Sequence, residues 1–493
     1  MVAAAVAAHA TVLGGGLIWL DHAHLGARLA LRPPAEWAEL FRQPFAGTGY
    51  YRPLTALSLS LDALAGSTAL YHTVNLALHA AAAALLLFAA SALGASRRAA
   101  TLGALLFAVH PIGSLVAGAI AFRSEALVAC GLFGLIVAHR RERPVWAVLC
   151  LLVAGLSKET GLALAPLFLV ALALGPGRRS GLWLLGAEAL ALALALGLRL
   201  GFAPAWSARF PELVAGQAVG TRLGAFAKSA GAVLLPVDRS ICDAFPITEL
   251  AAPLALAGGL LALGLCLLGW RGRTLGLLCV LSTLPSLQLV PTLRWWSPHY
   301  LYLPAGLFLV LVAERLEQRG ARAYAVAVCL VPLLGALSWK DGRRYRSDET
   351  LWRPEVTREP ACREGHFYLA EAARARRDSV AALLHYEAAL RSRPGVLAFV
   401  DLDATLTNQG LVLFAQGRWA EAREAFEAAL ERTPDELGRR KLRHDLAAVS
   451  LASGDAPRAL RELEEEIRRP DALRESLLLH QKARQALEAH QLR

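Results

Sequence analysis

The long apolar runs of this chain are confined to its first two thirds, and this uneven distribution constrains the fold more than any other feature. Residues 1–338 hold nearly all of these runs, whereas residues 339–493 are rich in Ala, Arg, Glu and Leu. With 56% hydrophobic residues and a mean hydropathy of +0.43, the chain is too apolar for an ordinary soluble protein. We predict a polytopic membrane domain over 1–338, a junction over 339–364 and a soluble helical domain over 365–493.

The apolar runs predict about eleven membrane-spanning helices. Arginine pairs mark five short loops between these runs, and the positive-inside rule assigns such loops to the cytoplasm. An odd number of spans then puts the N-terminus in the cytoplasm and residues 339–493 in the periplasm of a bacterial inner membrane. The predicted spans are 2–19, 71–94, 99–117, 121–139, 145–157, 160–175, 181–200, 251–270, 274–291, 301–314 and 321–338, and the loops are 96–98, 139–144, 177–180, 270–273 and 314–320.

Whether the number of spans is odd or even depends on one further segment, 222–236. We interpret it as an interfacial or re-entrant helix, because Lys228 interrupts the run and Pro236 ends it. If it crossed the membrane, the side assigned to the tail would reverse. The first 20 residues lack a basic start and are interpreted as the first span rather than a cleaved signal peptide.

Net charge and cysteine spacing do not indicate a nucleic-acid-binding or a metal-binding protein. The net charge of +11 agrees with the topology signals and is not interpreted as nucleic-acid binding. The seven cysteines have no metal-binding spacing. Cys242 and Cys362 lie in polar segments and could form a disulfide, although nothing else in the sequence supports that pair.

The soluble tail contains a repeat. The stretch GLVLFAQGRWAEAREAFEAALERTP (410–434) has small residues, Phe426 and Pro434 at the offsets of a tetratricopeptide repeat. An earlier copy contains Tyr386 and Pro394, a degenerate copy runs from 440 to 470, and residues 395–402 form an insertion between the first two copies. We predict an α-solenoid that binds a protein partner, with a generic bundle of helical hairpins as the alternative.

Several stretches of the membrane domain occur in a characteristic order. They are GYYRPLTALSLSLDAL (49–64), YHTVNLALHAAAAALLLF (71–88), LFAVHPIGSLVAGAIAFRSEAL (106–127), LSKET (156–160), PHYLYLPAGLFL (298–309) and SDETLWRPEVTREP (347–360). With the repeat tail, this order resembles the bacterial relatives of the transmembrane and tetratricopeptide-repeat O-mannosyltransferases. These are GT-C glycosyltransferases similar to the protein O-mannosyltransferases.

The resemblance implies an all-α GT-C-like membrane domain followed by a periplasmic tetratricopeptide-repeat solenoid. It also implies an inverting glycosyltransferase that moves a sugar from a polyprenyl-phosphate donor to a periplasmic acceptor. The acceptor hydroxyl could belong to protein Ser or Thr, a lipid-linked glycan or a cell-wall polymer. Such transfer needs a base, cations for the leaving phosphate and an apolar groove for the prenyl chain. We predict no cofactor. Phosphate is already a good leaving group, so a divalent metal is optional and the sequence does not indicate one.

The candidate site residues follow from this chemistry. Asp21, at the end of the first span, is the candidate catalytic base, with a structural cap as the alternative. Arg52, Arg123 and Lys158 are the candidate phosphate contacts, although the last two could instead be structural ion pairs at helix ends. Supporting roles are assigned to Glu125 (orienting Arg123), Glu159 (orienting Lys158), His72, His110, Tyr300 and Tyr302. We expect His110 to be structural and His79 to be a core residue.

The chain departs from the family pattern at positions that are usually polar or differently charged. Leu20, Gly113 and Leu115 stand where acidic or histidine side chains are usual, and His299 stands where arginine is usual. Two hypotheses remain. The first is an active glycosyltransferase that relies on Asp21 alone, which we favour. The second is a catalytically degenerate membrane scaffold that binds a lipid phosphate or a protein partner. A transporter is disfavoured, because the sequence has no inverted repeat of broken helices.

Overall fold

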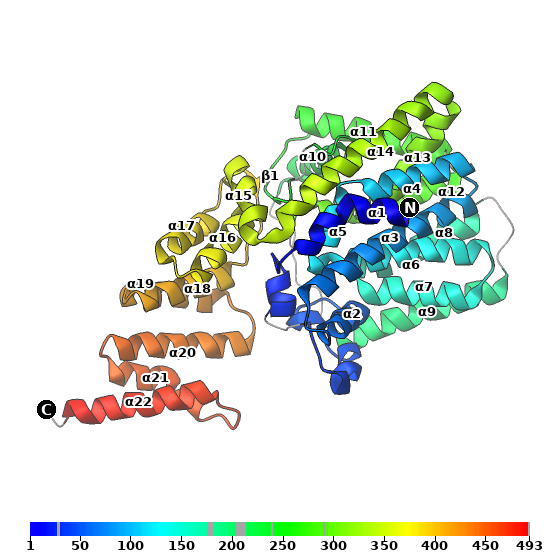
Figure 1. Ribbon diagram of the computed structural model, residues 1–493. Coiled ribbons are helices and arrows are strands. Elements are labelled where there is room, and N and C mark those ends of the chain that lie inside the picture. The colour runs from blue at the N-terminus through cyan, green and yellow to red at the C-terminus, as the bar shows by residue number, and fades with distance from the viewer. Residues whose placement is uncertain are drawn as a thin grey trace. The chain divides into compact units, whose positions relative to one another are not determined.

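A computed structural model describes residues 1–26, 30–175, 181–203, 213–237, 240–271, 273–288, 292 and 294–491 (Figure 1). The chain is mostly helical, as the sequence predicts. It divides into two compact units. Unit 1 comprises Met1–Ile241 and Phe245–Leu351, and unit 2 comprises Cys242–Ala244 and Trp352–Arg493. The division after Leu351 falls inside the segment that the sequence analysis assigns to the junction.

Unit 1 is built from apolar helices joined by short irregular segments. Its α-helices are α1 (Val2–His9), α2 (Pro53–Ala63), α3 (Thr68–Ala92), α4 (Arg97–Val109), α5 (Ile112–Gly118), α6 (Arg123–Arg140), α7 (Pro144–Ser157), α8 (Glu159–Leu174), α9 (Leu182–Phe202), α10 (Ala215–Leu234), α11 (Pro253–Arg271), α12 (Arg273–Ser282), α13 (Tyr302–Gln318) and α14 (Ala321–Gly342). Short 3₁₀-helical segments, one π-helical segment (η2) and one short strand lie between them. In chain order they are η1 (Ala10–Gly14), η2 (His22–Gly26), η3 (Pro34–Phe41), η4 (Phe45–Gly47), η5 (Ile120–Phe122), β1 (Phe245–Pro246), η6 (Leu284–Leu287), η7 (Pro298–Leu301) and η8 (Arg343–Arg346).

Five helical segments among the described residues are long and apolar enough to cross a membrane. They are Thr68–Ala92, Ile120–Arg140, Leu182–Phe202, Pro298–Gln318 and Ala321–Arg346. The pair α4 and α5, bent by 53°, would make a sixth if it counts as one span. The first predicted span, 2–19, is helical only as far as Gly14, where three consecutive glycines end it. The predicted arginine loop 177–180 lies outside the described residues.

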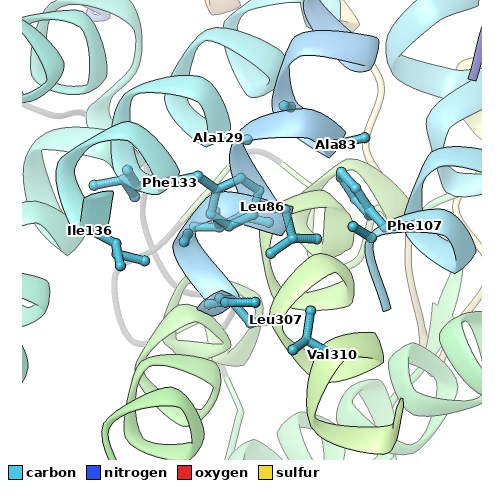
Figure 2. Packing of buried hydrophobic residues seen from close by; sticks show 14 of the residues in the cluster. Ala83, Leu86, Phe107, Ala129, Phe133, Ile136, Leu307 and Val310 are labelled. Atoms are coloured by element: carbon cyan, nitrogen blue, oxygen red, sulfur yellow. The ribbon is translucent and has the colours of Figure 1, made fainter. Parts of the chain in front are cut away.

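The core of unit 1 forms where α3, α4, α6 and α13 meet (Figure 2). Phe107 and Phe133 are fully buried and pack edge to face, with ring centroids 6.3 Å apart. Gly103 lets α4 approach α13 closely, because a Cβ there would lie only 2.5 Å from the Cα of Val310. Small residues at a helix contact let the two helix backbones approach each other closely.

Unit 2 is a run of antiparallel helices. These are α16 (Arg363–Ala375), α17 (Ser379–Leu390), α18 (Leu402–Ala415), α19 (Trp419–Arg432), α20 (Glu436–Ala452), α21 (Ala456–Ile467) and α22 (Arg474–Gln491), and α15 (Asp348–Arg358) leads into them. Four helices begin with an Asp side chain that accepts the backbone N–H three residues later, a cap that stabilises a helix start by about 1 kcal/mol. These caps are Asp378, Asp401, Asp435 and Asp455.

The repeat signature explains the packing within each helix pair. Gly410 of α18 leaves room for the ring of Phe426 on α19, since a Cβ there would lie 2.6 Å from that ring. Phe426 and Ala429 are buried in the cluster between the helices. The predicted insertion contains the short strand β2 (Val396–Leu397).

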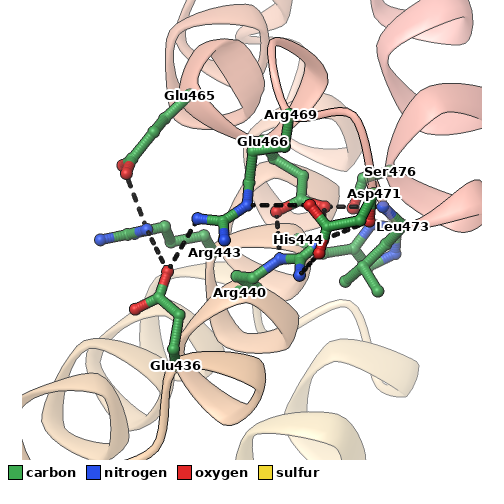
Figure 3. A network of polar contacts seen from close by, with 10 residues as sticks. All are labelled: Glu436, Arg440, Arg443, His444, Glu465, Glu466, Arg469, Asp471, Leu473 and Ser476. Atoms are coloured by element: carbon green, nitrogen blue, oxygen red, sulfur yellow. Dashed lines mark hydrogen bonds and ion pairs between the residues drawn. The ribbon is translucent and has the colours of Figure 1, made fainter.

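A buried polar network fastens the last repeats together (Figure 3). Arg440 on α20 forms a two-pronged ion pair with Glu466 on α21, with both N–O distances at 2.7 Å. The same guanidinium contacts Asp471 at 2.9 Å, and Glu466 also accepts the backbone N–H of Leu473 at 2.6 Å. Each charged group therefore has several partners, which a buried charge requires.

A disulfide joins Cys242 to Cys362 within unit 2. Both cysteines are buried, and 120 positions separate them in the sequence. Next to it, Asp243 accepts the backbone N–H of Phe399, in the predicted insertion, at 2.8 Å. The insertion between the first two repeats thus holds the 242–244 segment in unit 2.

Candidate functional site

Lys158 stands at the break between two apolar helices. Its backbone is extended, with φ −162° and ψ 149°, so α7 ends at Ser157 and α8 begins at Glu159. The ammonium group is buried and pairs with the carboxylate of Glu125, in the first turn of α6. Glu125 therefore orients Lys158, and not Arg123 as predicted from their closeness in sequence.

Glu159 holds Arg52 rather than Lys158, which corrects the second predicted pair. Its Oε2 lies 2.9 Å from Nε and 2.8 Å from Nη2 of Arg52, and its Oε1 accepts the backbone N–H of Tyr51 at 2.8 Å. The guanidinium also lies over the ring of Tyr50, 4.1 Å from the centroid. With side chains 13% and 23% exposed, Arg52 and Glu159 are more open to solvent than the Lys158 pair.

The guanidinium of Arg123 is enclosed by protein groups and is not open to solvent. Its Nε donates to Asn75 at 2.6 Å, its Nη1 donates to the backbone and hydroxyl oxygens of Ser58, and its Nη2 donates to Tyr71 O and contacts Asp62 at 2.5 Å. The guanidinium is fully buried, with four hydrogen bonds and the ion pair with Asp62 around it. We therefore remove Arg123 from the candidate phosphate contacts.

The carboxylate of Asp21 accepts hydrogen bonds from backbone N–H groups. Its Oδ1 accepts the N–H of Ala121 at 2.7 Å, and its Oδ2 accepts those of Ile120 and Ile18 at 3.3 Å. The side chain is completely buried. Burial raises the pKa of this carboxyl to about 7, although the three backbone donors act in the opposite direction. A carboxyl with this pKa suits proton transfer near neutral pH, but here it has no access for an acceptor.

His299 and Tyr300 join the Lys158 pair. The imidazole Nε2 of His299 lies 3.8 Å from Glu125, and the ring of Tyr300 lies 5.8 Å from the ammonium of Lys158. His299 also stacks on Phe122, with ring centroids 4.7 Å apart. The aromatic rings of His299 and Tyr300 therefore lie beside the pair of Lys158 and Glu125.

The other predicted lining residues lie elsewhere in unit 1. Tyr302 donates or accepts a 2.7 Å hydrogen bond with His79 in the core. His110 contacts Val233 O at 3.0 Å and accepts the N–H of Ile112, which fits the expected structural role. His72 is buried and lies 3.4 Å from Ala117 O. We therefore do not include these three in the site.

The sequence analysis missed two residues beside this group. The guanidinium of Arg294 lies over the ring of Trp19, 5.5 Å from its centroid, and is buried. Burial, with the nearby charges of Arg52 and Arg294, lowers the pKa of His24 to about 4. Arg52 and Arg294 therefore lie close enough to His24 to disfavour a second positive charge there, in addition to the larger effect of burial.

An apolar groove with a volume of about 250 Å³ lies in the same unit, between α10, α11, α12 and α13. Its lining is almost entirely apolar and includes Phe226, Leu261, Gly264 and Phe308. Leu301 also lines it, directly after Tyr300 in the chain. The same short segment, η7, therefore contributes Tyr300 to the cation group and Leu301 to the groove lining. Among the described residues, no group of three or more His, Cys, Asp or Glu side chains is placed so that it could hold a metal ion.

The fold and site together define an α-helical protein with an apolar helical unit, a buried cation group and a repeat tail. The tetratricopeptide repeat family matches residues 401–470, which confirms the repeats predicted there. Such repeats commonly mediate protein–protein interaction, and this role is indicated for the tail. Comparison with curated proteins and with solved structures finds no significant match.

Proposed function

We propose that this protein is an inverting glycosyltransferase of a bacterial inner membrane, and that it takes its sugar from a polyprenyl-phosphate donor. The observation that carries the proposal is the pair of cations at helix ends, Arg52 and Lys158, in a unit that also holds an apolar groove. The cations would bind the phosphate and stabilise it as it leaves, and the groove would hold the prenyl chain.

The membrane topology is part of the proposal. Five segments, or six with the bent pair, are long and apolar enough to cross a membrane. To reach eleven crossings, the proposal also counts the five shorter apolar helices, Val2–Gly14, Pro144–Ser157, Glu159–Leu174, Pro253–Leu268 and Thr274–Leu287. α10, which covers most of the ambiguous segment 222–236, is not among them. The proposed topology keeps the N-terminus in the cytoplasm and the repeats in the periplasm.

The disulfide supports the periplasmic side for unit 2. Disulfides form and persist in oxidising compartments, and the cytoplasm keeps thiols reduced. With the tail in the periplasm, the repeats would bind a protein there, either the acceptor or a protein that delivers it. Alkylation of intact cells before and after reduction tests the assignment: Cys242 and Cys362 should react only after reduction.

Release of sugar from the lipid tests the activity. We would incubate the purified chain with radiolabelled polyprenyl-phosphate mannose or glucose and solubilised envelope proteins, and measure water-soluble and protein-bound label. The wild type should release sugar, and Lys158→Ala should release about 100-fold less, because the leaving phosphate loses a charge-assisted partner. Donor binding without release of either sugar would favour the scaffold.

A further inference from the structure

Two histidines face each other across the first helix pair of unit 2. Nδ1 of His366, on α16, lies 3.0 Å from Nδ1 of His385, on α17, and the ring centroids are 5.3 Å apart. Both side chains are half-buried. Since the two nitrogens are within hydrogen-bond distance, the pair is a direct polar contact between the two helices.

The chemistry of imidazole sets the charge state that this contact requires. A neutral imidazole has one N–H and one acceptor nitrogen, so one of the two Nδ1 atoms donates and the other accepts. The donating ring can take up one further proton without losing the hydrogen bond. A second proton puts an N–H on both facing nitrogens, and two imidazolium groups then repel each other.

The surroundings of the pair favour two neutral rings. Burial, followed by the neighbouring His385, lowers the pKa of His366 to about 4, although the carbonyl of Pro360 acts in the opposite direction. Burial, followed by the positive charge of Arg353 on α15, lowers the pKa of His385. Both rings are therefore neutral at pH 7 and take up protons only below the ordinary histidine value of 6.5.

The other charged side chains on these elements interact elsewhere. Arg363, one turn before the first histidine, donates to two carbonyls at the end of α17 at 2.7 and 3.3 Å. Glu359 and Glu387 pair with arginines that follow α17, at 3.8 and 3.9 Å. Glu364 acts on the carboxyl of Asp401, before α18. None of these carboxylates contributes to the pKa of either histidine.

The next repeat has no titratable pair at the same place. Aligning the buried Tyr386 with Phe426 puts Leu406 and Ala425 at the positions of the two histidines. Both of these residues belong to the apolar cluster between the helices. The contact within the second helix pair is therefore independent of protonation at these positions, whereas the contact within the first pair is not.

We propose that His366 and His385 form an acid-sensitive contact, which holds the first repeat closed at neutral pH and lets α16 separate from α17 in acid. The inference does not depend on the proposed sugar transfer. The folded pair binds protons less tightly than free histidine, so its stabilisation is complete above about pH 6.5 and is lost as the pH falls toward 4. Because α-solenoids bind through the faces of consecutive repeats, acid would also change the surface that the tail offers to a protein.

Hydrogen exchange of the full chain, purified in detergent, tests this proposal. The protection of each helix is measured at pH 7 and pH 5 and corrected for the intrinsic exchange rate at each pH. Protection of α16 and α17 should fall at least about tenfold at pH 5, because the opened pair takes up protons that the closed pair excludes. Protection of α18 and α19 should not fall.

Two variants and one titration complete the test. The double variant His366→Gln/His385→Gln keeps side chains that can hydrogen-bond and removes both titrating groups, so the fall in protection should disappear. His480→Gln, on α22, is the matched control and should behave as the wild type does. An NMR titration of the wild-type imidazoles should show both rings protonating below pH 6.5, in parallel with the loss of protection.

Three results would overturn the proposal. The first is protection of α16 and α17 that stays constant between pH 7 and pH 5 in the wild type. The second is a fall in protection that persists in the double variant. The third is protonation of both rings without any loss of protection, which would show an ordinary surface pair. If the double variant does not fold, the titration of the wild type decides between these outcomes.

Discussion

The carboxylate of Glu159 fixes the guanidinium of Arg52 through two contacts of 2.9 and 2.8 Å, although the residues are 107 positions apart. One carboxylate oxygen also holds the backbone at Tyr51. The loop before α2 is thereby attached to the start of α8, next to Lys158. A phosphate at this point would meet cations whose positions are set before it binds, which reduces the entropic cost of binding.

Arg123 should matter for stability and not for donor binding. Arg123→Ala leaves Asp62 and Asn75 without their partner inside the protein, and we expect a loss of about 3 kcal/mol or more in the free energy of unfolding. Denaturant unfolding in detergent measures it. Arg42→Ala, which breaks a surface pair with Glu39, is the control and should change stability by less than about 0.5 kcal/mol. Equal effects of the two changes would refute the structural role.

Asp21 should make the stability of the protein depend on pH. Its folded pKa, about 7, is above the ordinary value of 3.8, so the folded state binds the proton more tightly. The resulting stabilisation is complete below about pH 4 and is lost as the pH rises through 7, by at most about 4 kcal/mol. Unfolding measured between pH 4 and 8 should show this slope in the wild type and a flatter one in Asp21→Asn. Equal slopes of unfolding free energy against pH in the two proteins would show that Asp21 does not cause the pH dependence.

The groove should select for the length of the prenyl chain. Gly264 lines it, and open space surrounds the position of its missing Cβ, so Gly264→Phe would fill the groove without an immediate clash. We expect KM for a long-chain donor to rise at least about tenfold and KM for a short-chain analogue to change little. Gly231→Phe is the control, since this exposed glycine also has open space at its Cβ position and does not line the groove. An unchanged KM in Gly264→Phe would place the lipid elsewhere.

The first repeat should gain stability from a glycine. Arg377 has a φ of +61° in the turn after α16, where the later repeats have Gly417 and Gly454 with φ of +73° and +88°. Arg377→Gly removes a steric cost of about 1 kcal/mol, so hydrogen exchange in α16 and α17 should slow several-fold. Arg376→Gly, where φ is −85°, should instead accelerate exchange. Faster exchange in Arg377→Gly would contradict the account.

The sequence predicted the helical class and the repeats well, because both depend on local periodicity. The positions of Gly410 and Phe426 already specify close packing of two helices, and the structure shows that packing. The end of α7 at Lys158 could also be predicted, since a charged pair interrupts two apolar runs.

Partners of the charged residues could not be predicted in the same way. Sequence neighbours suggested Arg123 with Glu125 and Lys158 with Glu159, but adjacent residues on a helix point in different directions. The observed pairs, Lys158 with Glu125 and Arg52 with Glu159, join separate elements that only the tertiary fold brings together. Arg294 and His24 were missed for the same reason, because no local pattern marks them.

Equilibrium binding of polyprenyl phosphate tests the central claim, that Arg52 and Lys158 form a lipid-phosphate site. We would titrate the purified protein with this lipid and with a polyprenyl alcohol of equal length, and compare the wild type with Arg52→Ala and Lys158→Ala. The account predicts that the wild type prefers the phosphate and that each substitution weakens its binding about 10- to 100-fold, with binding of the alcohol unchanged. Equal affinity for the two lipids, or no effect of either substitution, would contradict the site.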